Sequence, residues 1–132
     1  MVIAILGLLA TVGLASFRSS QIKGRDAQRK SDLGQIQKAL EMYYNDTGSY
    51  PDSLPEAGQP WENPDEEETI YMKEFPQDAR FGVYGYSSDG AQYALCARLE
   101  NEQDAKIGSC PEAIDCDSED CNYGVTSSNY IP

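Results

Sequence analysis

The sequence predicts an α+β fold in which one long N-terminal helix packs against a small antiparallel sheet. Three observations support this prediction: a helical pattern that continues without a break over residues 1–46, a hairpin signal at residues 88–90, and a loop-rich remainder with four cysteines. A chain of 132 residues is long enough for one small domain and an anchor, but too short for us to expect two domains.

The predicted helix has two chemically different halves. Residues 1–17 form an unbroken apolar run, whereas residues 18–46 are polar with a recurring apolar face. A helix that is apolar on all sides needs lipid or other apolar helices around it, and an amphipathic helix can pack on a domain. At ~1.5 Å per residue the apolar run reaches ~25 Å, near the lower limit for a membrane span. We expect residues 1–24 to form a membrane or filament-core segment and stem, and residues 25–132 to form an acidic globular head.

The second half of the helix supplies the predicted contact with the head. Asp26 and Arg29 interrupt its apolar face, so we expect the head to cover the helix only from about Ser31 onward. The charged side chains before that point should then be exposed, either as a solvated surface or as contacts between copies. Gly48 should end the helix as a left-handed cap, with Pro51 beyond it. The predicted core side chains of this half are Leu33, Ile36, Leu40, Tyr43 and Tyr44.

Charge is distributed unevenly along the chain. Residues 1–40 carry a net charge of +4 and residues 41–132 a net charge of −16, which together give −12. An acidic head argues against nucleic acid as its direct partner, because phosphate binding needs a basic surface. The chain contains no histidine, which removes the commonest general base and the commonest metal ligand. No carboxylate pair stands out either, so we predict no catalytic residues and no enzymatic activity.

The head is predicted to contain two strands, at residues 82–87 and 91–99, joined by a turn at Ser88, Asp89 and Gly90. A third short strand is predicted at residues 123–126. Trp61 lies in the proline-rich segment before these strands, and we expect it to anchor that segment in the core.

The cysteines predict two structural disulfides in an extracytoplasmic setting. Four cysteines allow three pairings, and the sequence does not choose between them. Four carboxylates also lie close together near the C-terminus and resemble the start of a calcium loop, although the usual glycine and the final bidentate acid are missing. They are either solvated acids or a calcium site, and no other cofactor is expected. The cysteines are Cys96, Cys110, Cys116 and Cys121, and the carboxylates are Asp115, Asp117, Glu119 and Asp120.

The N-terminal half carries a family resemblance. VIAILGLLA followed by RDAQRKSDLGQIQKALEMYYNDTGSYPDSL resembles the stem and first loop of bacterial type IV pilins and type II secretion pseudopilins. The resemblance covers residues 2–54 and continues more loosely through YMKEFP and YGYSSDG. It implies a structural subunit of an extracellular or periplasmic filament, which is a helical homo-oligomer. It also implies a single-pass inner-membrane protein before assembly, with pilus or secretion machinery as partner.

The family's basic leader, processing-site glycine and methylated first residue have no counterpart here, and Met1 falls inside what would be the membrane helix. The alternative function is a membrane-tethered extracytoplasmic binding or adhesion module, with Trp61, the acidic loop and the tail as its contact surface. Under the filament hypothesis, the side chains expected to mediate assembly are Val2, Ile3, Ile5, Leu6, Leu8, Leu9, Val12, Leu14 and Phe17, together with the stem cations Arg25, Arg29 and Lys30.

Overall fold

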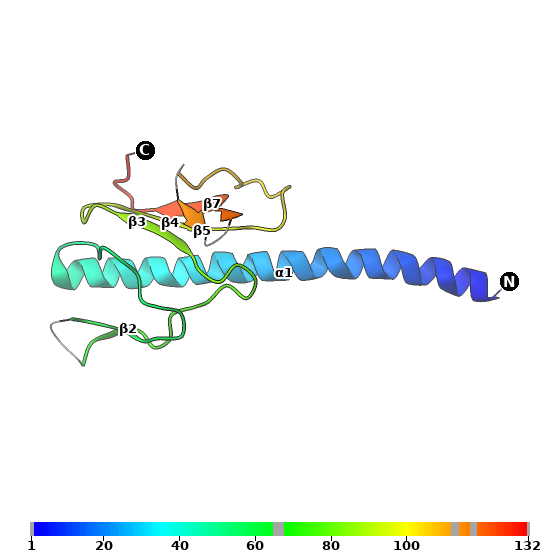
Figure 1. The fold of residues 1–132 in the computed structure, drawn as a ribbon, viewed down its shortest axis with the longest axis horizontal. Coiled ribbons are helices and arrows are strands. Elements are labelled where there is room, and N and C mark those ends of the chain that lie inside the picture. The colour runs from blue at the N-terminus through cyan, green and yellow to red at the C-terminus, as the bar shows by residue number, and fades with distance from the viewer. Residues whose placement is uncertain (1, 65–67, 112–113, 117–118, 132) are drawn as a thin grey trace.

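A computed structural model describes residues 2–64, 68–111, 114–116 and 119–131 of the chain. It confirms the α+β architecture, with one long helix against small antiparallel sheets (Figure 1). The elements in chain order are α1 (Val2–Thr47), β1 (Trp61–Glu62), β2 (Ile70–Met72), β3 (Gly85–Ser88), β4 (Tyr93–Ala97), β5 (Asp115–Cys116), β6 (Glu119–Asp120) and β7 (Tyr123–Thr126).

The helix α1 is 46 residues long and runs through both predicted halves without interruption. At ~1.5 Å per residue this corresponds to roughly 70 Å. It ends as predicted: Gly48 adopts a φ of 81°, and its amide donates a hydrogen bond of 2.8 Å to the carbonyl oxygen of Tyr44. Only glycine takes this conformation at little steric cost, which explains the position of the helix end.

The main sheet contains β3, β4 and β7 in that order, all antiparallel. The predicted hairpin and third strand are therefore confirmed, and Gly90 in the connecting turn has a φ of 83°. All five residues of β4 are buried, because both faces of this central strand are covered. Tyr93 and Leu95 belong to the core cluster with the helix, whereas Cys96 forms a disulfide with the C-terminal segment.

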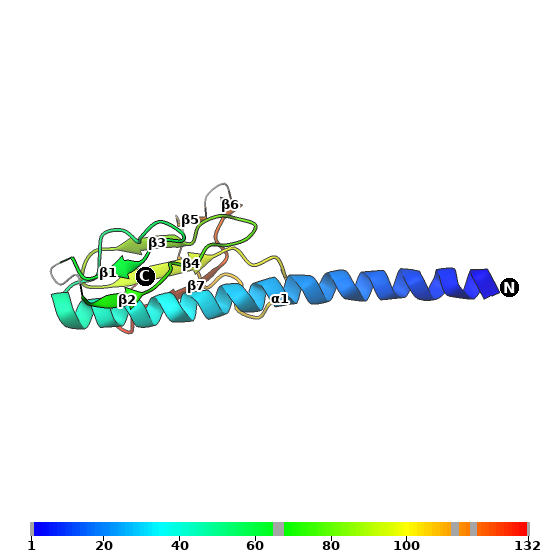
Figure 2. The same ribbon diagram turned by 90° about the horizontal axis from the view of Figure 1, so that it is seen from below.

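The head packs on one side of α1. Figure 1 shows the main sheet along one flank of the helix and β2 along the other, and Figure 2 shows both on the same side of it. Leu33, Ile36 and Leu40 each have no exposed surface, so the predicted apolar face of the helix is the centre of the core. The opposite face of α1 remains uncovered.

The head covers more of the helix than the sequence predicted. Asp26, Arg29 and Asp32 are buried, with exposed fractions of 3%, 3% and 5%. The expectation that coverage begins near Ser31 was therefore wrong. Side chains from residues 78–81 and 100–104 reach past the sheet towards the N-terminus and pair with the stem charges.

Within the part of the chain that the structure describes, no helix has the length and apolar character needed to cross a membrane.

Candidate functional site

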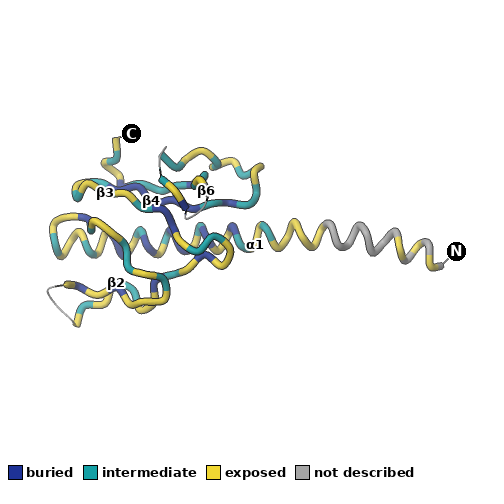
Figure 3. The backbone as a smooth tube through the Cα atoms, viewed as in Figure 1, coloured by how far each residue is buried: buried dark blue, intermediate teal, exposed yellow. Residues whose placement is uncertain are grey.

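The N-terminal half of α1 protrudes from the head (Figures 1 and 3). The apolar side chains described there are exposed: Ile3 by 85%, Ile5 by 60% and Phe17 by 61%. Exposed apolar side chains arranged along a free helix favour contact with another apolar surface. The other apolar assembly candidates fall outside the described side chains, so their surroundings remain untested: Val2, Leu6, Leu8, Leu9, Val12 and Leu14.

A second exposed surface continues from the protruding segment along the head half of α1. Exposed side chains recur there every three or four residues, which places them on one side of the helix. This side faces away from the buried residues of α1, and along the helix it follows the exposed residues 16–20 of the protruding segment. We name this uncovered side the open face; its residues are Gln21, Gly24, Gln28, Ser31, Gln35, Lys38, Met42 and Asn45.

A buried charge cluster joins the stem to the head. The guanidinium of Arg29 donates from Nε to Asp78 at 2.5 Å, and from Nη1 to Asp26 at 2.7 Å and to Glu100 at 2.9 Å. Its side chain is only 3% exposed. An arginine can satisfy several carboxylates at once because its planar group carries five donors in fixed directions.

Two of the three carboxylates, those of Asp26 and Asp78, also accept hydrogen bonds from backbone amides of head loops. Asp26 accepts hydrogen bonds from the backbone amides of Glu100, at 2.9 Å, and Asn101, at 2.8 Å. Asp78 accepts from the amides of Arg80 and Phe81. The cluster therefore fixes two loops of the head onto the helix as well as neutralising charge.

The pKa values follow from these contacts. The hydrogen bond from Arg25 lowers the pKa of Glu100, burial opposes this change, and Arg29 and Arg80 reinforce it, with a resulting pKa of about 2. Burial disfavours the charged form of Asp78, but the hydrogen bonds from Arg29 and two amides outweigh burial and lower its pKa. Both carboxyl groups are therefore ionised in the folded protein at neutral pH.

The stem cations expected to contact other copies pair with acids of their own head. Arg25 lies 2.7 Å from Glu100, and Lys30 lies 2.5 Å from Asp104. Their side chains keep 38% and 31% of their surface exposed, so contacts between copies remain a prediction for both. Arg29 has almost no exposed surface to offer, and the expectation that it lies bare was wrong.

Trp61 is buried, with 5% of its surface exposed, as the sequence predicted. Its ring lies 5.9 Å from that of Tyr43, 6.0 Å from that of Tyr71 and 6.2 Å from that of Phe75, measured between centroids. This aromatic group attaches the segment after the helix to α1. Because Trp61 faces inward, it does not form the contact surface that the binding-module alternative required.

The cysteines form two disulfides, Cys96–Cys110 and Cys116–Cys121. The prediction of two bridges is confirmed, and the structure shows which of the three possible pairings the chain adopts. Each bridge packs on a glycine of the sheet: a Cβ atom on Gly124 would lie 2.9 Å from Cys96 Sγ, and one on Gly85 would lie 2.7 Å from Cys121 Sγ. A side chain at either glycine would therefore collide with the bridge that packs on it.

The calcium prediction remains open. Asp115 and Asp120 face each other across the β5–β6 pair and are both exposed. Asp117 and the side chain of Glu119 lie outside the described residues. Among the residues that the structure describes, no group of three or more acidic, cysteine or histidine side chains is placed to hold a metal ion.

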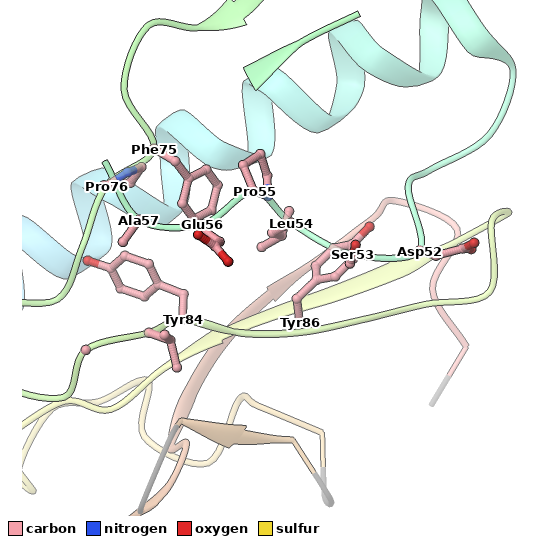
Figure 4. A pocket seen from close by; sticks show the side chains of 12 residues that line it. Asp52, Ser53, Leu54, Pro55, Glu56, Ala57, Phe75, Pro76, Tyr84 and Tyr86 are labelled. Carbon is pink, nitrogen blue, oxygen red and sulfur yellow. The ribbon is translucent and has the colours of Figure 1, made fainter. Parts of the chain in front are cut away.

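A cavity of about 360 Å³ lies between the segment after the helix and β3. Figure 4 shows Phe75 and Pro55 on one wall and Tyr84 and Tyr86 on the other, with the Glu56 carboxylate between them. We name it the aromatic pocket. Tyr84 and Tyr86 are fixed by hydrogen bonds from their hydroxyls to Asp32 Oδ2, at 2.6 Å, and to the carbonyl oxygen of Pro51, at 2.8 Å.

Sequence reasoning did not find Asp78, Glu100 or the aromatic pocket. One local signal pointed to the cluster: Asp26 and Arg29 occur three residues apart on the face that is otherwise apolar, where two unpaired charges would be costly. Their partners lie 49 to 75 residues further along the chain, so no local spacing identified them.

Comparison with known protein families matches residues 17–109 to type II secretion system (T2SS) protein G. Comparisons with curated proteins and with solved structures gave no match. The matched range includes the head half of α1, the buried charge cluster, the aromatic pocket and the β3–β4 hairpin, and it spans more than half of the chain. The resemblance to pseudopilins is thus confirmed, and with it the prediction of a structural rather than an enzymatic protein. The chain belongs to the type II secretion system protein G family of pseudopilins.

Proposed function

We propose that this chain is the repeating subunit of a secretion pseudopilus, and that copies associate through the protruding half of α1. The observation that carries this proposal is the 46-residue helix whose N-terminal half extends beyond its own head with exposed apolar side chains. Residues 1–24 form the assembly segment, and residues 25–132 form the head.

Burial of apolar surface supplies the driving force for this association. Full burial of an isoleucine or phenylalanine side chain contributes about 1.5–3 kcal/mol, so Ile3, Ile5 and Phe17 together contribute on the order of 5 kcal/mol per copy. The open face adds small and polar side chains, such as Gly24 and Ser31, which allow helices to approach closely. The acidic heads stay outside, where their net charge keeps the filament soluble.

The family supports the inner membrane and the periplasm as the place where the chain acts. In this proposal the chain is held at the inner membrane before assembly, and type II secretion machinery incorporates it into a periplasmic filament. The direct partners are other copies of the same chain and that machinery.

An Ile5→Glu variant tests the assembly segment. A carboxylate at an apolar interface between helices loses its hydration, so we expect filament yield to fall by at least tenfold while the head stays folded. The yield is measured by negative-stain electron microscopy of filaments from cells that express the chain with its secretion machinery, and head folding by near-ultraviolet circular dichroism.

Ile131→Glu is the matched control, because Ile131 is 77% exposed and lies at the other end of the chain. It should leave filament yield close to that of the wild-type chain. Normal filaments from the Ile5→Glu variant would contradict assembly through this segment.

A further inference from the structure

The aromatic pocket has the chemistry of a site for a cationic side chain. Its walls are apolar and aromatic, with Phe75 and Tyr84 both less than 10% exposed. Two carboxylates, Asp52 and Glu56, belong to its lining, and no lysine or arginine does. A guanidinium group suits such a place because it stacks on aromatic rings and pairs with a carboxylate at the same time.

Among the residues that the structure describes, Glu56 has no charge partner. Among the described residues, its carboxylate makes no ion pair and no side-chain hydrogen bond, in contrast with Glu100 and Asp104. Figure 4 shows this carboxylate in the gap between Phe75 and Tyr84. The rings beside it are held in place by hydrogen bonds to Asp32 and Pro51, so the pocket is preformed.

Arg18 is the complementary group. It is exposed on the protruding half of α1, and its helical neighbours three and four residues away carry no charge: Leu14, Ala15, Gln21 and Ile22. It makes no ion pair with any residue that the structure describes. The stem cations nearer the head differ in this respect, because Arg25, Arg29 and Lys30 already pair with their own head.

We propose that Arg18 of one copy enters the aromatic pocket of a second copy and pairs with its Glu56. This inference rests on the proposed filament. Tyr84 binds Asp32, so the pocket lies near the level of residue 32 on α1, 14 positions beyond Arg18. At ~1.5 Å per residue, Arg18 and the pocket of the same chain are roughly 20 Å apart along the helix, and two parallel copies in contact are staggered by about that distance.

A charge exchange tests this pair in assembled filaments. We expect Glu56→Lys and Arg18→Glu each to reduce filament yield by at least fivefold, and the double variant to recover most of the yield. Glu62→Lys and Lys73→Glu are the controls: both side chains are exposed on the head, undergo the same two charge changes, and lie outside the pocket and the open face. Both should assemble as the wild type does.

Cross-linking gives a second readout that does not depend on yield. In filaments of the Arg18→Lys variant, a carbodiimide should join the new amine to Glu56 of another copy, and mass spectrometry of digested dimers should identify the joined peptides. Cross-links that leave Glu56 unmodified and join the stem to other acids would overturn the pairing.

The outcomes separate the two proposals. If wild-type filaments form and Glu56→Lys filaments are equally abundant, the pairing is wrong and the filament function stands. If both single variants fail and the double variant does not recover, the pairing is also wrong. If the wild-type chain forms no filament with its machinery present, both proposals fail.

Discussion

The buried charge cluster makes a strong prediction for the Arg29→Met variant. Methionine keeps much of the volume but removes the cation, so Asp26 and Asp78 each retain two backbone amides and no positive partner. Glu100 keeps Arg25 and Arg80. Removing one partner from a buried ion pair costs about 3–5 kcal/mol. For a chain of this size, that loss corresponds to a fall in melting temperature of roughly 10 °C or more.

The assay is urea denaturation of the full chain in mild detergent, followed by near-ultraviolet circular dichroism. Lys30→Met is the matched control, because Lys30 is the next residue, carries the same charge and forms a partly exposed pair with Asp104. Pairs of this kind contribute up to about 1 kcal/mol. If Arg29→Met destabilises the head no more than Lys30→Met does, the cluster does not hold the head on the stem. The difference should be largest at neutral pH and should shrink in acid, because protonation of Asp78 then removes its unpaired charge in the variant.

Three further predictions concern the head. The pKa of Glu100 falls from its usual value of about 4.5 to about 2. The ionised carboxylate therefore stabilises the head by on the order of 3 kcal/mol above about pH 4.5, and this stabilisation is lost as the pH falls towards 2. Urea midpoints at pH 6 and pH 3 measure the loss, and Glu100→Gln should make the stability of the head less dependent on pH. Reduction of both disulfides should lower the melting temperature by roughly 10 °C, because the Cys96–Cys110 loop alone contributes about 3 kcal/mol; an unchanged melt with four free thiols would contradict this. Gly124→Ala should destabilise the head by about 1–3 kcal/mol, because the new Cβ would lie 2.9 Å from Cys110 Cα. Gly34→Ala has open space around the new Cβ and should stabilise the helix by up to about 1 kcal/mol. Equal changes in the free energy of unfolding for the two variants would refute the packing argument.

Local patterns predicted the elements that depend on local physics. The helix followed from apolar periodicity, its end from Gly48, and the hairpin from the turn residues before Gly90, and all three are confirmed. The burial of Trp61 followed from its large apolar side chain, which in a loop usually anchors that loop in the core. The two-residue strands β1, β5 and β6 were not predicted, because segments this short carry no measurable periodicity.

The charge cluster and the disulfide pairing depend on contacts between distant parts of the chain. The charges at Asp26 and Arg29 indicated an exposed stem, since a charged side chain is rarely buried unless it is paired. Their burial depends on Asp78 and Glu100, whose position beside the stem is set by the packing of the whole head. The aromatic pocket has the same origin, because its walls come from two segments on either side of β1 and β2 and from β3.

The most direct test of the central claim is cryo-electron microscopy of filaments isolated from cells that express the chain with its secretion machinery, combined with mass spectrometry of the subunit. The proposed function predicts thin filaments in which this chain repeats, with the protruding halves of α1 bundled in the core and the heads outside. A cell-bound monomer, with no filament containing the chain although the machinery is present, would contradict the proposal.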